Sequence, residues 1–293
     1  MPSLKEIRNR IRSVQNTQKI TRAMKLVAAA KLRRAQDNVV AARPYALKLR
    51  QMMATLAQVV DPEQEPLFEA REMPSKCLLI PITSDRGLCG GFNSTILRQL
   101  TRFVRENRDA WEGIGVAPVG RKGREGVRRL DMDTWLDMQE VLPDRTAPSV
   151  RHAVGVLCDL FVAGEVDRVY LVYNEFQSAL TQVVRTEQFL PLSADAFSDV
   201  ELPEVNVADM IFEPAREELL AEMIPRYLES QLYRALLESE ASEMGARMTA
   251  MDNATKNAGD LIDRLTLQMN RARQAAITTE LMEITSGAES LKG

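Results

Sequence analysis

Cysteine, histidine and aromatic residues are scarce in this chain of 293 residues, which has three cysteines, one histidine and 5% aromatics. Cys77, Cys89 and Cys158 are odd in number and show no C-x-x-C spacing. This argues against a disulfide framework or a zinc site and favours free thiols in a reducing compartment. No apolar run is long enough to cross a bilayer, and no signal peptide is recognisable. We therefore expect a soluble protein.

The patterns typical of catalysis are also missing. His152 lies in a predicted helix and has no serine or cysteine nucleophile motif with it. Asp85 is followed by Arg86, so a salt bridge is its simplest role. The motifs H-E-x-x-H and G-x-S-x-G and paired metal-ligand spacings do not occur. The sequence predicts no active site, no metal and no cofactor.

Charge is nearly balanced in total, at −3, but it is unevenly distributed. The first 34 residues carry ten basic residues and the single acid Glu6. A stretch from Glu217 to Glu243 is instead rich in glutamate. A basic first helix is compatible with nucleic acid, anionic lipid, an acidic protein partner or the acidic C-terminal helix of the same chain.

The C-terminal stretch, from about Glu213 to Gly293, has no proline after Pro225 and predicts one long helix. A helix from Arg226 to Thr285 would be roughly 90 Å long. Its apolar positions alternate in steps of four and three, a heptad-type seam with small or flexible side chains. The seam contains Met244, Met248, Met251, Thr255, Ala258, Ile262, Leu265, Met269, Ala272 and Ala276. Either a core helix of an all-α domain or a shaft that another helix wraps would give this pattern.

The N-terminal stretch predicts the partner helix. Ser3 and Glu6 form a capping box, and Leu4, Ile7, Ile11 and Val14 give a first apolar stripe. A second run with the same alternation contains Ala28, Leu32, Ala35, Val39, Ala42, Ala46, Leu49, Met53 and Leu56. We expect Pro44 to kink this helix or remove a hydrogen bond, and the seam to change register near Gln18. Two such terminal helices predict an antiparallel pair.

Between the helices, residues 61–74 are rich in proline and glutamate and predict a linker. Short apolar runs then alternate with helical patterns, which predicts a mainly parallel α/β layer of about five strands. The expected strands are 77–82, 114–119, 168–173 and 182–190, with one more near Trp135, and the expected helices are 94–107, 122–130 and 149–164. The chain thus divides into an N-terminal coiled-coil helix (1–60), an α/β domain (75–192) and a C-terminal coiled-coil helix (210–293).

A glycine-rich loop, Thr83-Ser-Asp-Arg-Gly-Leu-Cys-Gly-Gly-Phe-Asn93, follows the first expected strand and precedes a helix. This placement suits a phosphate cradle. The loop lacks the Gly-Lys-Ser/Thr ending of a P-loop, and its glycines do not match G-x-G-x-x-G. A tight turn at a partner surface is therefore the better interpretation than a nucleotide site.

Three segments carry a resemblance to a known family. The stretches 13–31, 84–93 and 243–258 together with 270–288 resemble the gamma subunit of F-type rotary ATP synthase, in the same order along the chain. The resemblance implies an antiparallel coiled coil of the two terminal helices with a Rossmann-like α/β domain inserted between them. It also implies a central-stalk subunit that turns inside a ring of three alpha and three beta subunits, couples proton flow to ATP synthesis and has no catalytic site.

The same resemblance implies partners and contact residues. The partners would be the alpha and beta subunits, the epsilon subunit and the c-ring of the membrane rotor, with no nucleic acid. Ring-contact residues would be Arg22, Met24, Lys25, Arg273, Gln274, Ile277, Thr278 and Glu280. The partner loop at the rotor base would contain Asp85, Arg86, Gly87, Leu88, Cys89, Gly90, Gly91 and Phe92.

Two departures from the family's organellar forms refine this expectation. The inserted dithiol of the chloroplast form has no counterpart, and no mitochondrial presequence is present. We therefore expect a peripheral protein on the cytoplasmic side of a bacterial inner membrane. A nucleotide-binding enzyme and a nucleic-acid-binding coiled coil remain as alternatives. The missing phosphate and metal ligands disfavour the enzyme, and the scarcity of stacking aromatics near the basic helix disfavours nucleic acid.

Overall fold

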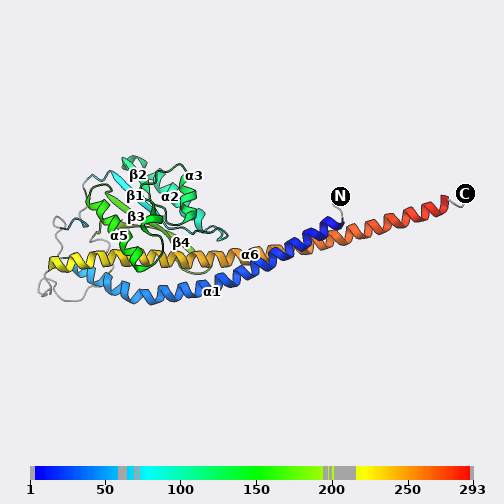
Figure 1. Cartoon of the computed structure of the whole chain (residues 1–293), viewed down its shortest axis with the longest axis horizontal. Coiled ribbons are helices and arrows are strands. Elements are labelled where there is room, and N and C mark those ends of the chain that lie inside the picture. Colours follow the sequence, from blue (N-terminus) through cyan, green and yellow to red (C-terminus); the bar gives the residue numbers. More distant parts are fainter. Residues whose placement is uncertain are drawn as a thin grey trace. The chain divides into compact units, whose positions relative to one another are not determined.

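The computed structural model describes residues 4–58, 65–68, 71, 73–193, 197, 200 and 216–290. Two compact units are present, one formed by Met1–Ala28 and Met248–Gly293 and the other by Ala29–Arg247. Helices α1 (Leu4–Ala57) and α6 (Arg216–Ser290) contribute to both (Figure 1). The predicted terminal helices are confirmed. The expected Ser3 cap and the start of the last helix near Glu213 lie outside the described residues.

The second unit contains a sheet of four strands in the order β2-β1-β3-β4. These are β1 (Lys76–Pro81), β2 (Gly113–Val116), β3 (Arg168–Phe176) and β4 (Gln182–Leu190). Strand β1 pairs in parallel with β2 and β3, and β4 pairs antiparallel with β3 through a hairpin. The predicted strands at these four places and the mainly parallel character are confirmed.

The fifth strand expected near Trp135 was wrong. Only a single bridge joins Val116 to Thr134, next to the Trp135 ring, which lies over Gly113 and Gly115. The ladder stops there because Asp137 caps the short helix α4 (Met138–Val141) by accepting a hydrogen bond from the backbone N–H of Gln139 at 2.9 Å. A helix cap three residues after the bridge leaves too little extended backbone for a strand.

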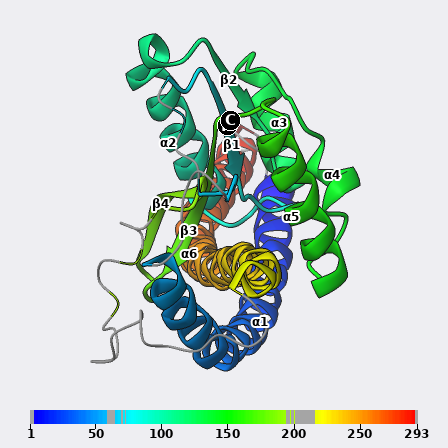
Figure 2. The ribbon, with the colours of Figure 1, turned by 90° about the vertical axis from the view of Figure 1, so that its left-hand side faces the viewer.

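The helices cover both faces of the sheet (Figure 2). Helices α2 (Phe92–Glu106) and α3 (Arg121–Arg129) pack through Leu97, Leu100 and Val127 on Cys77 and Leu79. Leu78 and Ile80 point to the other face, where α5 (Ala147–Val162) and the parts of α1 and α6 in this unit form the main core. Strand β1 is thus buried on both faces, as is usual for a parallel strand.

The predicted linker is in part a packed segment. Phe68 is 7% exposed and belongs to the main core, and the carbonyl of Leu67 accepts a hydrogen bond from the N–H of Leu192 at 2.7 Å. Arg71 donates hydrogen bonds to Asp167 and to the carbonyls of Phe161 and Val166. The composition of this stretch concealed three residues that attach it to the α/β domain.

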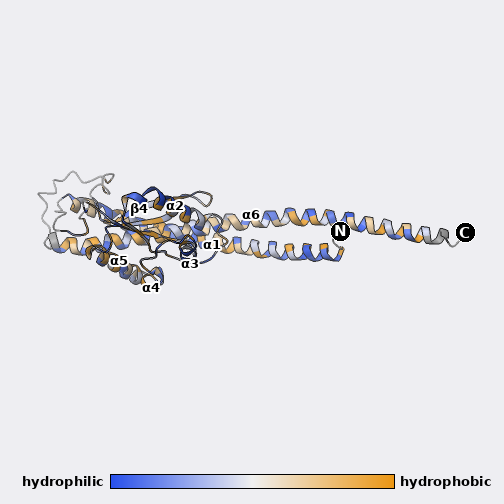
Figure 3. Cartoon of the chain, turned by 90° about the horizontal axis from the view of Figure 1, so that it is seen from above, coloured by the Kyte–Doolittle hydropathy of each residue, from blue (hydrophilic) through white to orange (hydrophobic). Residues whose placement is uncertain are grey.

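In the first unit, α1 and α6 form a coiled coil. Met251, Ala258 and Leu265 are buried on α6, and Ile7 and Ala28 are buried on α1. The α6 seam is therefore confirmed, and both helices show alternating hydrophobic and hydrophilic residues (Figure 3). The two prolines, Pro44 and Pro225, lie inside α1 and α6 without ending either helix.

The expected change of register near Gln18 was wrong. Gln18 and Lys25 are half-buried and Thr21 is 9% exposed, so these residues continue the steps of three and four from Val14 to Ala28. They were missed because they are polar, whereas a heptad position is defined by its direction and not by its hydrophobicity.

Candidate functional site

The last turns of α6, from Arg273 to Ser286, are exposed throughout. Seam positions further back along α6 are covered by α1, which begins at Leu4, and Leu265 is the last fully buried one. Four large apolar side chains are open to solvent here, with exposed fractions of 49% for Ile277, 60% for Leu281, 66% for Met282 and 68% for Ile284. A concentration of exposed apolar residues of this kind indicates a partner surface.

The exposed apolar residues lie on a different face from the seam. Ile277, Leu281 and Ile284 are spaced by four and three, whereas the heptad positions that follow Ala276 are Thr279, Glu283 and Ser286. One residue of an α-helix corresponds to a rotation of about 100°, so the new stripe points away from the face that α1 covers. This stripe is therefore not part of the face that α1 covers.

The predicted contact residues near this end share that exposure. Arg273, Gln274, Ile277, Thr278 and Glu280 are all exposed. Thr278 donates a hydrogen bond within its own helix, to the carbonyl of Gln274 at 2.9 Å. The structure thus brings the five residues onto one unpaired helical segment.

The predicted contact residues of α1 differ from one another. Arg22 is exposed and Met24 is half-buried. Lys25 instead forms an ion pair inside the coiled coil, where its Nζ lies 2.6 Å from Asp252 Oδ1. Hydrogen bonds from Lys25 and Lys256 hold the pKa of Asp252 below its ordinary value. The charge of Lys25 is therefore engaged within the chain.

Around this ion pair lies a set of polar residues that sequence reasoning missed, with Thr21 buried and the others half-buried. The Oγ1 atoms of Thr21 and Thr255 are 2.8 Å apart, and Thr21 donates to the carbonyl of Gln18 at 3.1 Å. Gln18 Nε2 lies 3.4 Å from the carbonyl of Thr255, and a Cβ on Gly259 would come within 3.2 Å of that nitrogen. We call Gln18, Thr21, Lys25, Asp252 and Thr255 the polar layer. Its polar groups bond across the seam, which favours one pairing of the two helices.

The glycine-rich loop is closed by its own side chains. Asn93 Oδ1 accepts from the N–H of Ser84 at 3.0 Å, and its Nδ2 lies 2.8 Å from Ser84 Oγ and 3.3 Å from Cys89 Sγ. Gly90 has a φ of 56°, which a residue with a side chain adopts at a cost. Leu88 adopts a φ of 65° and is 62% exposed at the tip of the loop. A strained leucine presented to solvent suits a contact surface.

Two further contacts fix this loop and occupy its polar groups. Asp85 Oδ1 accepts a hydrogen bond from the backbone N–H of Arg121, the first residue of α3, at 3.0 Å. Arg247 of α6 donates to the carbonyls of Arg86 and Gly87 at 3.2 and 3.3 Å. A carboxylate of the chain itself thus sits at a helix N-terminus where a phosphate would bind.

Two of the three thiols are buried or half-buried and protonated. Burial raises the pKa of Cys77 to about 12 and that of Cys158 to about 11, so neither is a thiolate at neutral pH. His152 is exposed on α5. Within the described residues, no three His, Cys, Asp or Glu side chains are grouped as metal ligands. The same residues include no helix with the length and apolar character needed to span a membrane.

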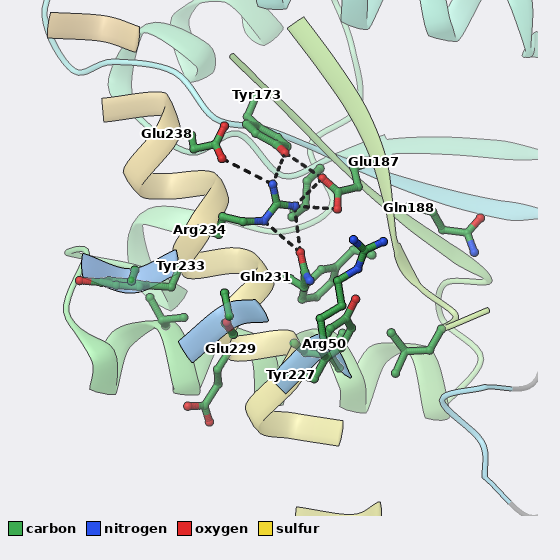
Figure 4. Close-up of a pocket in the computed structure, with 18 of the residues that line it drawn as sticks. Arg50, Tyr173, Glu187, Gln188, Tyr227, Glu229, Gln231, Tyr233, Arg234 and Glu238 are labelled. Carbon is green, nitrogen blue, oxygen red and sulfur yellow. Dashed lines mark hydrogen bonds and ion pairs between the residues drawn. The ribbon is translucent and has the colours of Figure 1, made fainter. Parts of the chain in front are cut away.

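A large groove of about 1680 Å³ lies in the second unit between α1, β4 and α6. Its polar centre is Arg234, whose guanidinium contacts both oxygens of Glu187 at 2.7 and 2.8 Å and the hydroxyl of Tyr173 at 3.0 Å (Figure 4). Gln231 accepts from the same guanidinium at 2.9 Å. Burial lowers the pKa of Arg234, but the negative charge of Glu187 raises it by more, so the pKa lies above its ordinary value. With its donors committed, Arg234 joins β3, β4 and α6 and offers no anion site.

Comparison with known proteins agrees with these features. The family model described as ATP synthase matches residues 3–291. The ATP synthase gamma chain of Geobacter metallireducens is 50% identical over the full length of both chains, and that of Geotalea uraniireducens is 48% identical, again over both full lengths.

Solved structures show the same fold. A chain of the Tetrahymena thermophila mitochondrial ATP synthase central stalk and c-ring is 31% identical, with a TM-score of 0.59, over 80% of this chain and 99% of that one. A chain of the Euglena gracilis mitochondrial ATP synthase in rotational state 3 is 19% identical, with a TM-score of 0.63, over 98% and 94%. The full-length identity to curated gamma chains, together with the paired terminal helices and the inserted α/β domain, establishes that this chain belongs to the ATP synthase gamma chain family.

Proposed function

We propose that this chain is the rotor shaft of an ATP synthase, a non-catalytic subunit that couples proton flow to ATP synthesis in the beta subunits. The observation that carries the proposal is the single-helix end of α6, which exposes an apolar stripe that α1 does not cover. The closed glycine-rich loop and the protonated thiols of Cys77 and Cys158 support a role without catalysis.

Rotation inside a ring requires contacts that are made and released repeatedly. Ala28, Thr255 and Ala258 make the seam narrow, so the coiled coil fits an axial channel. Exposed ion pairs, such as those expected of Arg22 and Arg273, contribute about 0–1 kcal/mol each and re-form readily at a new angle. Each angle of the shaft then favours a different state of the neighbouring beta subunit through differential contacts.

We assign the contact residues accordingly. Arg22 and Met24 on α1 and the segment Arg273–Glu280 on α6 face the ring of alpha and beta subunits. Lys25 acts inside the coiled coil through Asp252. The loop 85–92, with Leu88 at its tip, contacts partners at the base of the rotor.

The remaining partners follow from the same assignment. The central stalk of the Tetrahymena thermophila enzyme was solved with a c-ring. By analogy, the α/β domain of this chain lies with the epsilon subunit on the c-ring, as a peripheral protein on the cytoplasmic side of a bacterial inner membrane. No nucleotide, metal or nucleic acid is needed for this role.

The test is Ile277→Ala in the reconstituted complex. Burial of this side chain against an apolar sleeve contributes about 1–3 kcal/mol, so the variant is expected to weaken assembly or coupling without abolishing it. The measurements are the yield of intact complex and ATP-driven proton pumping per ATP hydrolysed. Removal of residues 273–293 is expected to have a larger effect of the same kind.

Val162→Ala is the matched control, because Val162 is 56% exposed on α5 and loses a similar apolar area. Wild-type assembly and coupling in both Ile277→Ala and the truncation would show that this end of α6 does not contact the ring. Separately, micromolar binding of ATP to the isolated chain in calorimetry would contradict the non-catalytic assignment.

A further inference from the structure

Helix α2 carries an exposed row of arginines opposite its buried side. Ile96, Leu97 and Leu100 face the sheet, while Arg98, Arg102 and Arg105 are exposed in steps of four and three. These steps place the three guanidinium groups on one face over about two helical turns. The row is part of the α/β domain and lies on neither of the coiled-coil surfaces described above.

The neighbouring helix α3 extends this charge. Gly126 packs so closely on α2 that an added Cβ would approach a Leu97 methyl group to 2.4 Å. The two following arginines, Arg128 and Arg129, are exposed. We call Arg98, Arg102, Arg105, Arg128 and Arg129 the arginine face.

The charge of this region is opposite to that of the chain. Residues 92–131 contain nine basic and five acidic residues, whereas the whole chain has a net charge of −3. Arg121 and Lys122 pair with Glu125, and Arg124 lies near Asp137. In the part of the chain that the structure describes, no ion pair is formed by any residue of the arginine face. Arg129 acts on Glu125 only from beyond ion-pair distance, as one of the cations that lower the pKa of that carboxyl, so the five guanidinium groups remain accessible to a partner.

The composition of the face indicates the kind of partner. A guanidinium group forms a planar fork that matches a carboxylate in a bidentate manner, and all five cations are arginines. Leu130, 39% exposed, provides little apolar surface for insertion into a bilayer. Exposed acids at or just beyond the C-terminal ends of these two helices, namely Glu106, Asp109 and Asp131, would repel a surface of uniformly spaced phosphates. Separate carboxylates on a peptide can instead pair with individual arginines.

We propose that the arginine face docks an acidic protein segment, rich in glutamate or aspartate, by carboxylate–guanidinium pairs. Such pairs are exposed and screened by salt, so the contact is weak and reversible. A weak contact on the α/β domain is compatible with a subunit that moves past its neighbours. The proposal concerns a surface distinct from the end of α6, and its failure would leave the rotor-shaft assignment intact.

The experiment measures binding of fluorescent deca-glutamate to the full chain by anisotropy, at low and at physiological ionic strength. The parent is expected to bind at low salt and to weaken as salt rises. The triple variant Arg98→Gln, Arg102→Gln and Arg105→Gln is expected to bind roughly ten-fold more weakly, since three exposed ion pairs are removed. The corresponding triple lysine variant keeps the charge but not the fork, and is expected to retain an intermediate affinity.

The matched control changes Arg33, Arg34 and Arg43 to glutamine. These three exposed arginines of α1 lie in the same unit, and the total charge changes by the same amount. Equal weakening in both triple variants would show a general charge effect and overturn the proposal. Tighter binding of the parent to anionic phosphatidylglycerol vesicles or to a single-stranded oligonucleotide than to deca-glutamate would overturn it as well, because the face would then recognise phosphate.

Discussion

The cluster around Asp167 gives a quantitative prediction about the stability of the α/β domain. Asp167 is 8% exposed, and its Oδ2 accepts hydrogen bonds from the backbone N–H groups of Ser75 and Lys76 at 2.7 and 2.8 Å. Arg71 donates to Oδ1 and stacks on the ring of Phe161 at 5.0 Å. One carboxylate thus holds the beginning of β1, the beginning of β3 and the segment before β1.

The pKa of Asp167 converts this geometry into free energy. Burial opposes ionisation, but the hydrogen bonds from Arg71, Lys76 and Ser75 lower the pKa from 3.8 to about 2. At about 1.4 kcal/mol per pKa unit, the ionised group stabilises the folded state by about 2.5 kcal/mol. Because the pKa is lower in the folded state, this stabilisation is complete above about pH 5 and is lost as the pH falls from about 4 to about 2.

We therefore expect Asp167→Asn to lower the free energy of unfolding by about 2–3 kcal/mol at pH 7, and by about half as much at pH 3. Urea unfolding followed by tryptophan fluorescence measures this, since Trp111 and Trp135, the two tryptophans of the chain, both lie in the α/β domain. Asp109→Asn, at an exposed position, is the control. An equal loss at both pH values, or a loss no larger than that of the control, would refute the reasoning.

Two further predictions concern Glu238 and the polar layer. Burial raises the pKa of Glu238, and within the described residues its Oε2 has no hydrogen-bond partner, so its ionisation destabilises the fold as the pH rises above about 4.5. In urea titrations, Glu238→Gln should therefore gain stability relative to the parent between pH 4 and pH 8, and a constant difference would count against this. In the polar layer, Thr21→Val and Thr255→Val should each cost about 1 kcal/mol, but together less than the sum, because the second change removes a hydroxyl that has already lost its partner across the seam. Hydrogen exchange of residues 14–28 measures this, and strict additivity would show that the two hydroxyls act independently.

The sequence was sufficient wherever structure depends on periodicity. The steps of three and four predicted the paired helices and the buried residues Met251, Ala258 and Leu265. The alternation of short apolar runs with helical patterns predicted the four strands and the helices between them. In both cases each residue's environment is repeated along the chain, so local pattern is enough to identify it.

The sequence was insufficient wherever structure depends on a single distant contact. Arg71 and Asp167 are 96 residues apart, Arg234 and Glu187 are 47 apart, and Thr21 and Thr255 are 234 apart. Nothing near Arg71 distinguishes it from an ordinary linker residue. Thr21 had one usable signal: it lies at a heptad position, although its side chain is polar.

At the end of α6, the apolar residues no longer follow the seam of the coiled coil, and this change of helix face carries functional information. An apolar stripe that continued the seam beyond Ala276 would be explained by pairing with a longer α1. The observed stripe of Ile277, Leu281 and Ile284 is rotated by about 100°, and no described element of its own unit covers it. Pairing within the chain cannot account for these residues, and their exposure has a cost in water that only a partner removes. The ring contacts that we propose for this chain therefore include the apolar residues that its own coiled coil leaves uncovered.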